Sequence, residues 1–147
     1  MLPARKRSAA FWTTMILALG AGAGRAAVIA VDGTTCSLEN AILSAKSDNA
    51  VGGCSAGAGP DTILLGTDVV LTAPATPEIE GGPSGLPPVT TTMTIAAGAG
   101  STIERSSALE CSPGDPTAFR LFTVAAGGDL SLTGVALRNG CIASDSF

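Results

Sequence analysis

The 147-residue sequence contains no histidine and no tyrosine, and its aromatic side chains are Trp12 and four phenylalanines. Without imidazole, the chain has no histidine to act as general base, nucleophile or metal ligand, which excludes Ser-His-Asp and Cys-His catalysis. Basic residues are also scarce, because residues 28–147 hold 4 Lys and Arg against 12 Asp and Glu, a net charge of −8. Phosphate binding needs clustered Lys and Arg, so we expect no nucleic-acid partner.

Small residues take the place of large ones, since the chain has 19 glycines and many alanines and threonines. Its length allows one domain. A core of large aromatic side chains is therefore not expected. Thin layers of small and β-branched residues fit this composition better.

The N-terminus has the three parts of an export signal. Residues 5–7 (RKR) are basic, residues 9–19 are uncharged and apolar, and small residues follow. Cleavage motifs stand at 21–23 (AGA) and 24–26 (GRA). A membrane-spanning helix would need about 20 apolar residues, more than this segment offers. We expect residues 1–26 to be a signal peptide, and the exported product to keep no membrane segment.

The cysteines all lie after this signal. An even number of cysteines in an exported chain predicts disulfides, and four cysteines allow three pairings. A zinc site is the competing interpretation, but there is no CxxC motif and no histidine, and the spacings of 18, 57 and 30 residues do not suit one. We expect disulfides, and no metal or cofactor. The cysteines are Cys36, Cys54, Cys111 and Cys141.

One helix is predicted, over residues 37–46, between a short strand at 28–31 and a loop at 47–60. Ser37 is a favourable N-cap. An apolar stripe at helical spacing follows, so these residues are expected to serve as a structural cap over the strands. The cap residues are Ser37, Leu38, Ala41 and Ile42.

From Asp61 onward the pattern is one of short strands whose apolar positions recur about every 7 or 8 residues. Such spacing is typical of a sandwich, a barrel or a β-solenoid. Hairpin signals are nearly missing, since Asn139-Gly140 is the single Asn-Gly pair, and this favours the solenoid. Asn139 is expected in a left-handed turn with a structural role. The predicted strands are 62–65, 69–72, 93–95, 101–104, 119–124, 130–133 and 135–137.

Several segments, in order, resemble those of bacterial CSLREA-domain proteins. Residues 36–42 (CSLENAI) are similar to the CSLREAI motif, although Glu39 and Asn40 replace its Arg-Glu pair. The GGC, DTI-x-L and GLP segments of that family, and its strand ending in NG, also have counterparts here. These are residues 52–54, 59–65, 85–87 and 130–140.

This resemblance implies an all-β, right-handed parallel β-helix with a short N-terminal capping helix. Residues 27–60 would form the cap, and residues 61–147 would form two or three coils of an apparently truncated solenoid. Cys36 opens the cap helix and Cys54 lies in the loop that returns beneath it, so a Cys36–Cys54 bridge is expected. Cys111 then pairs with Cys141 by elimination.

The resemblance also implies a secreted or outer-surface bacterial protein. We expect a non-catalytic scaffold or adhesin-like segment whose partners are further coils, cell-surface components or polysaccharide. The alternative is the N-terminal part of a polysaccharide-degrading, lyase-like enzyme. Glu78 and Glu80 are the only close acidic pair, and Arg120 and Arg138 are the cations in predicted strands. Dispersed carboxylates do not favour that alternative, so no enzymatic activity is expected.

Overall fold

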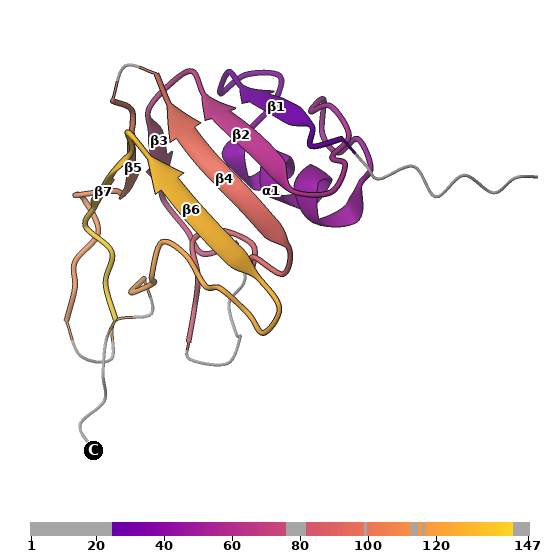
Figure 1. Cartoon of the computed structure of the whole chain (residues 1–147). Helices are drawn as coiled ribbons and strands as arrows, with labels where there is room; N and C mark the ends of the chain where they lie inside the picture. Colours follow the sequence, from indigo (N-terminus) through magenta and orange to yellow (C-terminus); the bar gives the residue numbers. More distant parts are fainter. Residues whose placement is uncertain (1–24, 76–81, 99, 113–114, 116, 143–147) are drawn as a thin grey trace, which may run out of the picture.

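The computed structural model describes residues 25–75, 82–98, 100–112, 115 and 117–142. The expected signal peptide lies almost entirely outside these residues, as do Glu78 and Glu80. The described part contains one helix and seven strands (Figure 1). In chain order these are β1 (Val28–Val31), α1 (Leu38–Ser47), β2 (Asp61–Leu65), β3 (Val69–Leu71), β4 (Thr92–Ala97), β5 (Thr102–Arg105), β6 (Asp129–Thr133) and β7 (Ala136–Arg138).

Helix α1 begins and ends on local signals. The Ser37 hydroxyl accepts a hydrogen bond from the Asn40 N–H at 3.2 Å, which satisfies one of the free donors of the first turn. The helix stops at Asp48, whose φ of +52° is left-handed. Its inward face, which includes Leu38, Ala41 and Ile42, is buried. Figure 1 shows α1 beside β1 and β2, the strands against which it packs.

Four strands form a parallel sheet in the order β1-β2-β4-β6. The register aligns Ile29, Ile63 and Ile95 in one row, and none of these side chains is exposed. Alternate residues of a strand point to opposite faces, so this row and its neighbours cover the core while Leu64 faces solvent. The next residue in the row is Leu132 of β6.

The other three strands form a smaller parallel sheet in the order β3-β5-β7. Each of its strands follows a strand of the larger sheet after a short turn, so β2 leads to β3, β4 to β5 and β6 to β7. Val69, Ile103 and Leu137 align in one row of this sheet. The two sheets thus place corresponding apolar rows on the two sides of one core.

The expectation of an all-β, right-handed parallel β-helix is wrong. The described strands make two small separate parallel sheets and pack with a helix, an α/β-like arrangement, and they do not close into a solenoid. The 7- to 8-residue recurrence measured the strand–turn–strand pairs, which alternate between the sheets. This recurrence gave no information about a third sheet, which a closed solenoid would have required.

The absence of a third sheet has a local cause. The segment between β3 and β4 contains Pro83, Pro87 and Pro88, which have no N–H to donate to a strand ladder. It makes only isolated parallel bridges, Ser84 with Arg120 and Val89 with Val124. The strand predicted at 119–124 is therefore absent, and these two bridges stand in its place.

Candidate functional site

Two disulfides join the four cysteines in the expected pairs. Cys36 is bonded to Cys54 and Cys111 to Cys141, so both pairing predictions are confirmed. Cys36 and Cys54 are buried in the core between α1 and the strands. Cys141 is buried as well, whereas Cys111 is exposed. Disulfides persist in oxidising compartments, and this pair of bonds is consistent with an exported protein.

The turn that leads into Cys36 is organised by one carboxylate. Asp32 Oδ1 accepts hydrogen bonds from the N–H groups of Thr34, Thr35 and Cys36 at 2.9, 2.7 and 3.0 Å. These bonds, with the bond from Cys36 the largest contribution, lower the pKa of Asp32 to about 2. The ionised side chain thus fixes the backbone that positions the first disulfide and the start of α1.

This arrangement predicts an acid-dependent loss of stability. The pKa of Asp32 is lower in the folded protein than its ordinary value of 3.8. Its contribution is therefore fully present above about pH 4 and is lost as the pH falls toward about 2. Thermal melts between pH 5 and pH 2 should fall less steeply for Asp32→Asn than for the wild type. Asp48→Asn, at an exposed left-handed position that Asn tolerates, is the control and should follow the wild-type curve.

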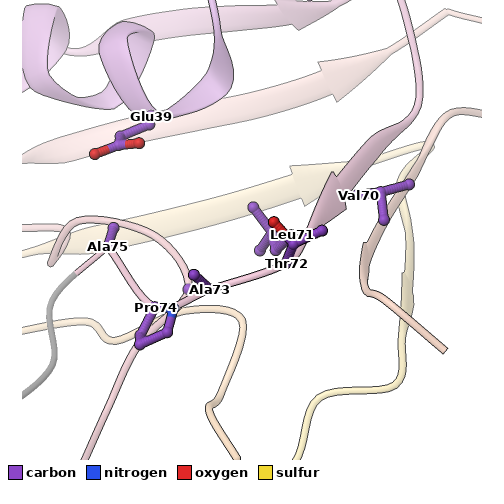
Figure 2. Close-up of a pocket in the computed structure, with 8 residues that line it drawn as sticks. Glu39, Val70, Leu71, Thr72, Ala73, Pro74 and Ala75 are labelled. Carbon is purple, nitrogen blue, oxygen red and sulfur yellow. The ribbon is translucent and has the colours of Figure 1, made fainter. Parts of the chain in front are cut away.

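A shallow hollow lies between α1 and the segment that follows β3. Its volume is about 440 Å³. Figure 2 shows Glu39 coming from α1, opposite the chain from Val70 to Ala75. Glu39 is the one ionisable side chain among the described residues that line the hollow, and it is exposed. A single solvated carboxylate over apolar and backbone groups supplies negative charge but no acid–base pair.

Arg105, at the end of β5, is a buried cation. Its Nε donates to the Asn139 carbonyl at 2.9 Å, and Nη2 donates to the Leu109 carbonyl at 3.1 Å. The guanidinium lies 5.8 Å from the centre of the Phe119 ring. Asn139 has a φ of +56°, a left-handed conformation, which turns its carbonyl into this contact. Arg105 therefore fastens the segment that the Cys111–Cys141 bridge also holds.

Asp61, at the start of β2, is a buried anion with an exposed fraction of 2%. Its Oδ1 accepts from the Ala27 N–H at 3.0 Å and from the Ala58 N–H at 2.8 Å. Among the described residues, Oδ2 has no hydrogen-bond partner. A Cβ built on Gly57 would lie 2.5 Å from Oδ2, so only glycine allows this approach.

The outer edges of β6 and β7 are open, because no described strand pairs with them. Leu132 and Leu137 align with Ile95 and Ile103 of the neighbouring strands, whose side chains are fully buried, yet their own exposed fractions are 37% and 46%. Leu130 and Val135 next to them are half-buried. Asp129 begins β6 and Arg138 ends β7, so this end of the molecule carries one charge of each sign.

The two arginines of the predicted strands, Arg120 and Arg138, differ in their surroundings. Arg138 is exposed on β7, whereas Arg120 is half-buried at its bridge to Ser84. Within the described ranges, no three His, Cys, Asp or Glu side chains are grouped in a way that could hold a metal ion. In the same part of the chain, no helix has both the length and the hydropathy that a membrane span needs.

No protein-family model, curated protein or solved structure matches this chain.

Sequence reasoning missed Asp61 and Arg105, the two buried charges. The signal was available in the two-residue period of the strands. Asp61 shares its face with Ile63, and Arg105 shares its face with Ile103, so both side chains had to point inward. The strand period could not reveal the distant partner of each side chain, which lies 34 residues away in both cases: Ala27 for Asp61 and Asn139 for Arg105.

Proposed function

We propose that this chain is a non-catalytic scaffold module of an exported bacterial protein, secreted or held at the outer cell surface. The two disulfides, and the segments that resemble those of CSLREA-domain proteins, support this location. The observation that carries the scaffold role is the difference between the two ends of the stacked sheets. Helix α1 packs at the β1–β2 end, while the β6–β7 end presents apolar rows without a described neighbour.

The partner of this end is a second copy of the same chain. Exposed apolar edge strands pair readily with another chain, and twofold symmetry is the commonest form of self-association. A twofold axis through the β6–β7 corner lays β6 of one copy antiparallel to β7 of the other. Leu132 then lies opposite Leu137 of the second copy. Arg138 shares a face with Asp129 of that copy, so opposite charges meet across the contact.

Sedimentation velocity of the exported, oxidised protein over a range of concentrations tests this proposal. The wild type should show a concentration-dependent dimer. Leu132→Lys should abolish the dimer, because it places an unpaired charge opposite Leu137 in the apolar part of the contact. Leu64→Lys is the matched control, since Leu64 is similarly exposed but on the outer face of β2, and it should still dimerise. A wild-type monomer at all concentrations would contradict the proposal.

The proposed absence of catalytic activity is tested by a separate measurement. The same preparation is incubated with pectin and alginate, with and without calcium. We expect no new reducing ends and no ultraviolet absorbance from an unsaturated sugar. Either signal, if lost in Arg120→Ala or Arg138→Ala, would instead support a lyase.

A further inference from the structure

Asp61 is a buried carboxylate with an incomplete set of donors. Both of its bonds go to one oxygen, Oδ1, and come from neutral backbone N–H groups. Burial of an ionised carboxylate is costly unless a cation or further donors compensate it. Oδ2 is enclosed against Gly57 and has no partner among the described residues. The site therefore lacks a positive charge and at least one donor.

The backbone nitrogen of Ala27 is the atom best placed to supply both the missing positive charge and the missing donor. It lies 3.0 Å from Oδ1, and Ala27 is only half-buried. The position of Ala27 is fixed from its other side, because the Ala27 carbonyl accepts from the Thr62 N–H at 2.8 Å. Sheet pairing between β1 and β2 thus holds this nitrogen at the carboxylate.

Ala27 directly follows the second cleavage motif, residues 24–26. Hydrolysis of the Ala26–Ala27 bond adds water across the amide, leaving a carboxylate on Ala26 and an amine on Ala27. At neutral pH that amine is largely protonated, since an α-amino group has an ordinary pKa of about 8. An ammonium offers three N–H donors and a full positive charge in place of one neutral N–H, so it can bond to both Oδ1 and Oδ2.

We propose that Asp61 is a built-in binding site for the mature N-terminus, so that the signal is removed after Ala26 and the Ala27 α-ammonium forms a buried ion pair with Asp61. This inference rests on the proposed export of the chain. The inference predicts that the second cleavage motif, residues 24–26, is used and not the first. Processing after Ala23 would keep Ala27 as a neutral amide and leave the carboxylate uncompensated.

The experiment starts with export of the full chain by a bacterial host and the intact mass of the product, which should begin at Ala27. A product that begins at Gly24 would leave export intact and overturn the ion pair. An uncleaved product would overturn both proposals.

Measurements of thermal stability then test the ion pair separately from the choice of cleavage site. Ala26→Leu blocks the second motif, because signal peptidases need a small residue there, and should yield a product that begins at Gly24. Its melting temperature should be lower than that of the wild type by on the order of 5 °C. Ala23→Leu is the matched control, because it spares the second motif and should melt like the wild type.

Asp61→Asn separates the ion pair from a general effect of chain length. Asparagine keeps one acceptor oxygen for the Ala27 and Ala58 N–H groups but carries no charge. The difference in melting temperature between the two start sites should fall close to zero in the Asp61→Asn background. If the difference persisted there, the N-terminus would be acting on stability without Asp61, and the proposal would be wrong.

Discussion

Replacing Ile42 with aspartate is expected to remove the chain from the soluble folded fraction. Ile42 has no exposed surface and belongs to the same core cluster as Ile29 and Ile63. The substitution deletes a buried side chain, which alone costs about 2–5 kcal/mol, and adds a carboxylate with no cation beside it. Domains of this size have a total stability of roughly 5–15 kcal/mol, so the folded state should not survive.

The measurement is soluble yield after export, followed by thermal melting and limited proteolysis of whatever remains. Leu64→Asp is the matched control, because it puts the same charge on the solvent-facing side of β2, and it should fold. Ile42→Val should also fold, with a loss of about 0.5–1.5 kcal/mol. An Ile42→Asp variant that melts at the wild-type temperature would show that α1 does not pack on the sheet in solution.

Removal of the Cys36–Cys54 disulfide is the second large effect. The bond closes a loop of 18 residues, and the chain-entropy relation gives about 3 kcal/mol for that length. Both sulfurs are also buried in the core, so the double substitution to alanine leaves a cavity between α1 and the strands. We therefore expect the Cys36→Ala, Cys54→Ala variant to lose more than the entropy alone predicts.

The Cys111–Cys141 bond is the internal comparison. Its loop of 30 residues is longer, and entropy alone ranks it slightly higher, at roughly 3.6 kcal/mol. Cys111 is exposed, however, and Arg105 holds the same segment through Asn139 and Leu109. Denaturant unfolding should thus show the larger loss for the Cys36–Cys54 pair. The opposite order would mean that loop length outweighs burial here.

Short-range signals in the sequence determined the individual elements. Ser37 and the apolar stripe that follows it predicted α1, because an N-cap and a helical period act within a few residues. The two-residue alternation placed most strands within one or two residues of their observed bounds. The position of Cys36 at the helix start and of Cys54 in the returning loop was enough for the disulfide pairing. The signal peptide stays a prediction, because almost all of its residues are outside the described part of the structure.

Tertiary structure alone decided how the strands are shared between sheets. A repeat of 7 or 8 residues is equally compatible with a closed solenoid and with two separate sheets, since it records only strand, turn and strand. The outcome depended on whether the segment between β3 and β4 could form a third ladder, and its prolines leave only isolated bridges there. The distant partners of Asp61 and Arg105, which are Ala27 and Asn139, could not be predicted from the sequence either. Each lies 34 residues away, so it comes into contact only after the parallel strands have set their register.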